Sequence, residues 1–217
     1  MPARRRFAAA VFVLSLSLNA PLRAEPILDQ SLVPPQPEDA LYALINECCA
    51  FVGQTYTAGL TGWLTEVRVA VTGHDDRYPL HVGIYGTSDG LPTGEAIGGT
   101  TIESASAPLT LPIVFDTPIY QQAGIRYAIL VNFAGAPPPG PYQALGHWEG
   151  TPGSRLDLYP GGRFVAKYGD SWIPSAYYRN WEDLYFQTIV DPIPEPATML
   201  LVGAGVVAAL RRGCRYS

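Results

Sequence analysis

Residues 124–133 read Gly-Ile-Arg-Tyr-Ala-Ile-Leu-Val-Asn-Phe, and an apolar side chain occupies every second position of this stretch. A strand turns successive side chains to opposite faces of its sheet, so this spacing predicts a strand with one apolar face. That face carries Ile125, Tyr127, Ile129, Val131 and Phe133. The stretch therefore favours a half-buried strand of an antiparallel sheet.

Shorter stretches with the same alternation lie on both sides of residues 124–133. Their apolar positions are Val67, Val69 and Val71; Leu80, Val82 and Ile84; Leu111, Ile113 and Phe115; and Leu184 with Phe186. Clusters of Gly and Pro separate these stretches at intervals of roughly ten residues, which is typical of all-β sandwiches and barrels. We therefore predict an all-β fold, namely a jelly-roll-like antiparallel β-sandwich of about eight to ten strands.

The composition agrees with this fold class and excludes one class of partner. Charged residues make up 15% of the chain, whereas Gly and Pro number 22 and 21, a balance that favours strands and turns over surface helices. The 14 basic and 19 acidic residues give a net charge of −5, so the chain lacks the positive charge that holds nucleic-acid phosphates. We expect no nucleic-acid partner.

The N-terminal residues follow the order of a secretory signal peptide. Three arginines, Arg4 to Arg6, precede an apolar stretch from Phe7 to Leu18, and small residues follow at Ala20 and Ala24. This order predicts a signal peptide over residues 1–24.

Two further segments complete the predicted organisation up to the C-terminal tail. Residues 25–49 begin with a proline-rich stretch, which predicts an extended N-terminal arm, and residues 39–49 fit either a short helix or an irregular segment. Residues 50–191 then form the β-sandwich ectodomain.

The C-terminal tail combines a Pro-Glu-Pro box, an apolar stretch and a basic end. The box is Pro194, Glu195 and Pro196, and the apolar residues 197–210 precede Arg211 and Arg212. Because prolines exclude a helix before residue 197, the apolar stretch predicts a short transmembrane helix of about 21 Å, less than the roughly 30 Å of a hydrocarbon core. The arginines would face the cytoplasm, so the β domain would lie on the opposite side.

These three elements, in this order over residues 192–217, resemble the PEP-CTERM family of sorting signals. The resemblance implies that an exosortase recognises the chain and cleaves at or near Pro194, Glu195 and Pro196, which are then a substrate site. It also implies export by the secretion machinery and transient anchoring in the inner membrane through the helix over residues 197–210. The protein would end at the cell surface, in the outer envelope or outside the cell.

No motif in the sequence predicts a catalytic residue, a metal ion or a cofactor. The histidines, His74, His81 and His147, are scattered and stand in none of the local signatures that surround catalytic Ser or Cys nucleophiles. The carboxylates that could act on a glycosidic bond are Glu149, Asp157, Asp170, Glu182 and Asp183, and nothing selects two of them.

Aromatic residues concentrate in the last third of the β domain and give the best candidate binding site. Trp and Tyr combine a flat apolar ring with a polar group, which suits both protein interfaces and the apolar faces of sugar rings. We predict that four of them line a surface that binds a glycan or a partner: Trp172, Tyr177, Tyr178 and Trp181.

Three hypotheses of function follow from these patterns. The first is a non-enzymatic cell-surface or extracellular-matrix protein, sorted by exosortase, that binds polysaccharide or other envelope components. The second is a secreted hydrolase that acts on glycans or esters, in which acidic residues or His147 perform acid–base chemistry. The third is a structural envelope component without a ligand.

Overall fold

The computed structural model describes residues 25–33, 41–44, 49–72, 79–103, 111–135, 147–150, 159–174 and 183–193. Every regular element in these ranges is a β-strand, and the strands within each sheet pair antiparallel. The strands are β1 (Ile27–Leu32), β2 (Leu41–Leu44), β3 (Cys49–Thr57), β4 (Gly62–Val69), β5 (Val71–Thr72), β6 (Leu80–Ser88), β7 (Leu91–Ile102), β8 (Leu111–Gln121), β9 (Arg126–Phe133), β10 (His147–Gly150), β11 (Phe164–Tyr168), β12 (Ser171–Pro174) and β13 (Phe186–Pro192).

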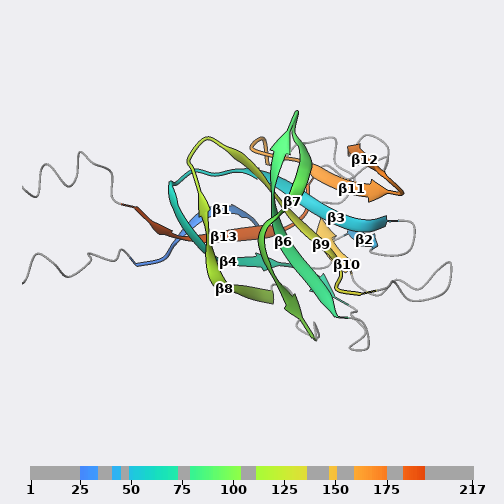
Figure 1. Ribbon diagram of the computed structural model, residues 1–217, viewed down its shortest axis with the longest axis horizontal. Helices are drawn as coiled ribbons and strands as arrows, with labels where there is room; N and C mark the ends of the chain where they lie inside the picture. The colour runs from blue at the N-terminus through green and yellow to red at the C-terminus, as the bar shows by residue number, and fades with distance from the viewer. Residues whose placement is uncertain are drawn as a thin grey trace, which may run out of the picture.

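The strand order is that of a jelly roll. The four-stranded sheet has the order β1-β13-β4-β8, and the six-stranded sheet has the order β12-β11-β3-β9-β6-β7 (Figure 1). Eight strands form the jelly roll and can be numbered one to eight in chain order: β1, β3, β4, β6, β7, β8, β9 and β13. With these numbers, the first sheet has the order 1-8-3-6 and the second, without β11 and β12, has the order 2-7-4-5. This is the double Greek key of a jelly roll, so the predicted fold class is confirmed. Strands β11 and β12 extend the second sheet, and β2, β10 and β5 form a small third sheet.

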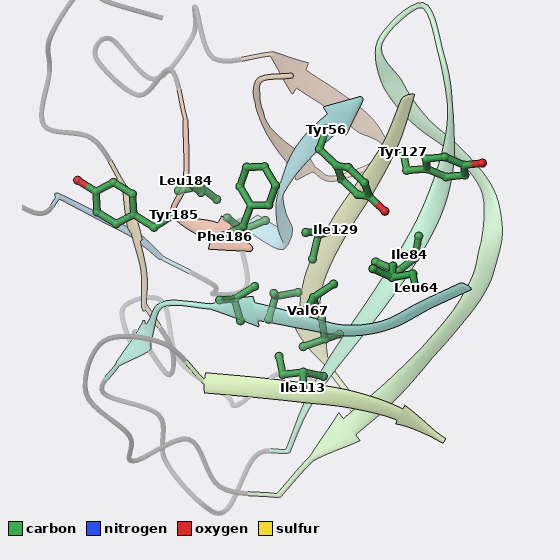
Figure 2. Packing of buried hydrophobic residues seen from close by; sticks show 14 of the residues in the cluster. Tyr56, Leu64, Val67, Ile84, Ile113, Tyr127, Ile129, Leu184, Tyr185 and Phe186 are labelled. Atoms are coloured by element: carbon green, nitrogen blue, oxygen red, sulfur yellow. The ribbon is translucent and has the colours of Figure 1, made fainter. Parts of the chain in front are cut away.

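The main hydrophobic core fills the space between the two large sheets. Figure 2 shows Leu64, Val67 and Ile113 of the four-stranded sheet gathered with Ile84 and Ile129 of the six-stranded sheet. All five side chains are at most 1% exposed. The apolar alternation read from the sequence therefore identifies the inward face of these strands.

One end of the central strand differs from its predicted pattern. Ile125 lies in the turn before β9 and is 48% exposed, whereas Tyr127, Ile129, Val131 and Phe133 are buried as predicted. The carbonyl of Ile125 accepts a hydrogen bond from the N–H of Ala58, so this residue joins two turns rather than the core.

Part of the predicted N-terminal arm belongs to the sandwich. Residues 27–32 form β1, which pairs with β13, and Pro26 and Pro34 stand outside this stretch, where they do not interrupt the pairing. Residues 41–44, within the segment for which a short helix was considered, form β2 and pair with β10.

The first and last strands lie side by side, and the chain therefore enters and leaves the sandwich at one end (Figure 1, left). The same end carries the β3–β4 turn and the β8–β9 turn, which are joined by backbone hydrogen bonds between Ala58 and residues 124 and 125. The N–H of Ile193 donates to the carbonyl of Thr61 and fixes the departing chain against the first turn. We call this the exit end.

We expect Ile129→Ala to lower the free energy of unfolding by about 2–5 kcal/mol, because the substitution leaves a cavity between the sheets. The matched control is Val114→Ala on β8, where the side chain is 61% exposed and the loss should stay below about 0.5 kcal/mol. Urea unfolding followed by circular dichroism measures both values. Equal losses in the two variants would contradict this assignment of the core.

Candidate functional site

The outer face of the six-stranded sheet, which points away from the main core, is curved and partly enclosed. Strand β6 and strand β7 form a long hairpin with register shifts around Tyr85, and β7 contacts β12 although the two are opposite edges of the sheet. Bulges bend a strand and increase its twist, which allows the hairpin to arch over the face.

The tip of this hairpin is fixed by Arg163, which precedes β11. Asp89 and Gly90 both have positive φ, of 52° and 73°, as a tight two-residue hairpin turn requires. The guanidinium of Arg163 donates to the carbonyl of Gly90 at 3.2 Å and 3.3 Å and to that of Asp89 at 3.2 Å. Since β3, β9 and β6 lie between β11 and β7 in the sheet, these bonds span the curved face.

A second, smaller hydrophobic cluster lies beneath the arch. Its centre is Ala128, Leu130 and Val165, all fully buried, and the partly buried side chains of Phe51, Tyr85, Leu91 and Trp172 pack against it. Strand β9 is thus buried on both faces, with alternate residues in the main core and in this cluster. The cluster fills the half of the outer face nearer the exit end.

Beyond the cluster, one residue from each of the six strands stands in a single row across the sheet. The pairing registers place Lys167 opposite Phe51, Phe51 opposite Asn132, and Asn132 opposite His81. Trp172 extends the row beside Lys167, and Thr101 extends it beside His81. We call these residues the outer row: Trp172, Lys167, Phe51, Asn132, His81 and Thr101.

Two aromatic rings and one ammonium group form one end of the outer row. Phe51 and Trp172 meet edge to face, with ring centroids 6.1 Å apart and an interplanar angle of 62°. The Nζ of Lys167 lies 5.6 Å from the centroid of Phe51 and 6.0 Å from that of Trp172. This cation–π geometry holds a positive charge between two partly exposed rings.

Glycines beside the outer row accommodate the side chains of their neighbours. Gly53, Gly83 and Gly99 occupy the next row toward the exit end, together with Leu130. A Cβ on Gly83 would lie 2.9 Å from Tyr85 and 3.0 Å from His81, and one on Gly99 would lie 2.7 Å from the Nε2 of His81. Larger residues at either glycine would therefore displace the imidazole ring, which leans over both of them.

Asn132, at the centre of the row, has an unused hydrogen-bond acceptor. Its Nδ2 donates to the carbonyl of Phe133 at 2.8 Å, while its Oδ1 is buried and receives no hydrogen bond from the described residues. A buried carbonyl oxygen without a donor costs about 1–3 kcal/mol, so an internal water that donates to it would be favoured.

A second polar group lies inside the sandwich and has a structural role. The carboxylate of Asp183 is fully buried, accepting hydrogen bonds from Gln54 Nε2 at 2.8 Å and from the N–H of Tyr159 at 3.0 Å. The N–H of Leu184 donates to Gln54 Oε1 at 2.7 Å, which ties β3 to the segment before β13. Asp183 was one of the carboxylates considered for glycoside hydrolysis, and its partners instead make it a link between strands.

Near the exit end, two tyrosines continue this internal network. Tyr56 donates to Gln121 Oε1 at 3.1 Å, Tyr159 donates to Gln30 Oε1 at 2.7 Å, and Gln121 donates to the carboxylate of Asp29 at 2.8 Å. Burial raises the pKa of Tyr56 well above its ordinary value and raises the pKa of Tyr159 to about 12. Both phenols therefore stay neutral donors rather than acting as bases.

The structure includes some of the residues singled out in the sequence and leaves others out. Trp172 is half-buried in the outer row, where it packs on Phe51. Tyr177, Tyr178 and Trp181, like Pro194, Glu195 and Pro196, lie outside the described residues, so their predicted roles remain predictions. The same holds for Asp157 and Glu182. Among the described residues, no group of three His, Cys, Asp or Glu side chains is placed to hold a metal ion.

Sequence reasoning missed most of the outer row. The alternation in β6 does place His81 outward, but the sequence gives no sign that Phe51, Lys167 and Asn132 stand beside it. Those neighbours depend on pairing between strands up to about a hundred residues apart in the chain, which local patterning does not encode.

The C-terminal residues decide where the protein goes. Residues 192–215 match the family model of the PEP-CTERM protein-sorting motif. The chain carries a PEP-CTERM sorting motif. This motif indicates an exported, cell-surface-directed protein that an exosortase processes. The match begins at Pro192, the last residue of β13, so the sorting motif follows the sandwich without a spacer.

Neither a curated relative nor a membrane-spanning helix among the described residues adds to this assignment. No significantly similar sequence is found among curated proteins. Within the ranges that the structure describes, no helix is long and apolar enough to cross a membrane. The predicted signal peptide over residues 1–24 and the predicted helix over residues 197–210 both lie outside those ranges.

The buried phenol of Tyr159 predicts a loss of stability in alkali. Its pKa is about 12 in the folded protein and about 10 in the unfolded chain, so the folded state binds more protons between these values. Stability from this group is complete below pH 10 and falls as the pH rises to 12. Chemical unfolding at a series of pH values should show this decline, and Tyr159→Phe should make it shallower.

The matched control is Tyr168→Phe, which removes an exposed hydroxyl and should leave the alkaline decline as steep as in the wild type. An identical decline in Tyr159→Phe would show that this phenol is not the group responsible.

Proposed function

We propose that the protein is a non-enzymatic surface or extracellular-matrix protein whose outer row binds polysaccharide. The observation that carries the proposal is the combination, in one row, of two aromatic rings with amide, imidazole, hydroxyl and ammonium groups. Aromatic faces stack on the apolar faces of sugar rings, and the polar groups would bind hydroxyls. Lys167 favours a glycan that carries carboxylate, sulfate or phosphate groups.

The architecture supports an extended ligand over a small one. The row crosses all six strands, which at about 4.8 Å between neighbours gives a track of roughly 24 Å. A track of this length accommodates several sugar units of a chain. The glycines beside the row let the His81 imidazole lie flat against the sheet, which keeps this ring beside the row.

The position of the outer row relative to the sorting motif supports the same proposal. Asn132 lies six residues along β9 from Arg126, which begins the strand at the exit end, a distance of about 20 Å. The row therefore lies toward the end of the sandwich that faces away from the departing tail. A domain held by that tail would offer the row to the surrounding matrix.

Phe51→Ala and His81→Ala should each weaken binding to the host's extracted surface polysaccharide roughly thirtyfold, the effect of losing about 2 kcal/mol at an interaction hot spot. Affinity electrophoresis with immobilised polysaccharide measures the change. Trp63→Ala is the matched control, because Trp63 is an exposed aromatic residue on the other sheet and should leave retardation unchanged.

Thermal unfolding of the same variants separates lost binding from lost folding. If folded Phe51→Ala and His81→Ala proteins were retarded by the polysaccharide as strongly as the wild type, the proposed polysaccharide site would be refuted. The same incubations should release no reducing sugar, and release that depends on the protein would refute the non-enzymatic role.

Sorting is tested separately, in the native host with and without the exosortase. We expect intact mass to show loss of the residues after the Pro-Glu-Pro box only where the exosortase is present, because cleavage is predicted at or near Pro194, Glu195 and Pro196. Cell fractionation should place the shortened protein at the surface or in the medium. A tail retained in both strains would show that the motif is not processed.

A further inference from the structure

The exposed large apolar residues gather at the exit end. Among the described residues, ten large hydrophobic side chains are exposed, and six of them lie at this end. These six are Ile27 and Leu28 at the start of β1, Trp63 on β4, Tyr120 on β8, Ile125 in the β8–β9 turn, and Ile193 after β13. We call them the exit patch.

The exit patch contains an aromatic pair. Trp63 and Tyr120 are direct partners in the β4–β8 register, their ring centroids are 5.4 Å apart, and their interplanar angle is 66°. Each side chain is 45% exposed. On its other side Trp63 is paired with Asp191, one residue before the sorting motif begins.

The tail keeps this patch close to whatever holds the sorting motif. The motif match runs from Pro192 to residue 215, and its apolar stretch begins at Ala197. Four residue steps separate Ile193 from Ala197, so the extended chain spans at most about 14 Å between them. A membrane that contains the apolar stretch would therefore lie within about 14 Å of the exit patch.

We propose that the exit patch docks the domain on the lipid bilayer until the exosortase cleaves the tail. Trp and Tyr are the residues that proteins favour at the boundary between headgroups and hydrocarbon, because their rings are apolar and carry one polar group. The charged residues at this end include Glu25, Asp29, Asp191 and Arg126, of which only Arg126 is basic, so they do not form a basic cluster. Docking then depends on the apolar and aromatic groups, and uncharged headgroups suffice.

Docking would set the position of the Pro-Glu-Pro box. With the exit end held at the interface, Ile193, the residue before the box, would lie near the bilayer surface, within reach of a membrane enzyme. After cleavage the apolar stretch no longer holds the patch, and the six side chains alone determine whether the domain stays. This inference rests on the sorting motif and is independent of the polysaccharide proposal.

The test uses the full chain reconstituted in phosphatidylcholine vesicles with acyl chains brominated near the headgroups. Bromine quenches tryptophan fluorescence only at close range, so Trp63 should be quenched and Trp172, some 20 Å farther along the strands, should not. All proteins in this test carry Trp148→Phe and Trp181→Phe, so Trp63 and Trp172 are their two tryptophans, and Trp63→Phe removes the one in the patch while keeping the apolar contact. We expect this variant to lose most of the bromolipid quenching, whereas Trp172→Phe should retain all of it.

A second variant keeps the reporter and weakens the contact. Tyr120→Ser with Ile125→Ser retains Trp63 and should reduce its quenching at least twofold, because two of the six apolar groups are gone. Equal quenching in wild type and Trp63→Phe would overturn the proposal, as would no loss in the double variant. Protection of Trp63 in unbrominated vesicles together with a dimeric mass would show that a second copy covers the patch instead, and would also overturn it.

Discussion

The sandwich depends on the insertion of β13 between β1 and β4. This last strand pairs along its length with β4 and along most of its length with β1, so the four-stranded sheet is not complete until residues 186–192 are in place. Phe186 and Val190 of the strand enter the main core, and Leu184 just before it is fully buried. Among the described strands, β1 has β13 as its only sheet neighbour, so the pairing of β1 depends on the C-terminal strand as well.

This constraint links folding to sorting. Because the sorting motif begins at Pro192, cleavage within the Pro-Glu-Pro box leaves every residue of β13 attached to the domain. Cleavage only a few residues earlier would remove part of a central strand, with the ends of β4 and β1 left unpaired on that side. The motif match thus begins at the last residue of the last strand, Pro192. The long sequence separation between β1 and β13 also predicts slow folding, since a large loop closes before this pair forms.

The outer face of the six-stranded sheet shows how a second burial event creates a candidate site. The β6–β7 hairpin bends over this face and meets Arg163, which encloses Ala128, Leu130 and Val165. The cluster ends one row before Phe51, Asn132 and His81, where aromatic and polar groups replace aliphatic ones. The aliphatic cluster therefore stabilises the fold, and the outer row beside it is the part of this face that a ligand could contact.

The parts of this structure that the sequence predicts are those that depend on neighbouring residues. Alternation identifies the inward faces of β4, β6, β8 and β9, because each strand repeats its own pattern. It fails at Ile125, whose apolar side chain continues the pattern past the end of the strand into a turn. The sequence also suggests that Asp183 is a surface charge, whereas in the structure this residue is buried and bound by Gln54, which is 129 residues away in the chain. For the same reason, the sequence does not predict which residues stand together in the outer row, because this requires the registers of five strand pairs.

The two ends of the sandwich carry different chemistry, and strand direction explains why this separation is stable. Antiparallel pairing fixes Trp63 beside Asp191 at the exit end and Asn132 beside His81 about 20 Å away, so neither group can move toward the other without a register shift. A one-residue shift in β4 or β9 would turn Val67 or Ile129 out of the core, which the packing does not permit. The main core therefore holds the apolar exit patch toward the tail and the outer row away from it. A ligand that binds the outer row therefore binds at the end of the domain opposite the tail, because the packing of the main core fixes where the row lies.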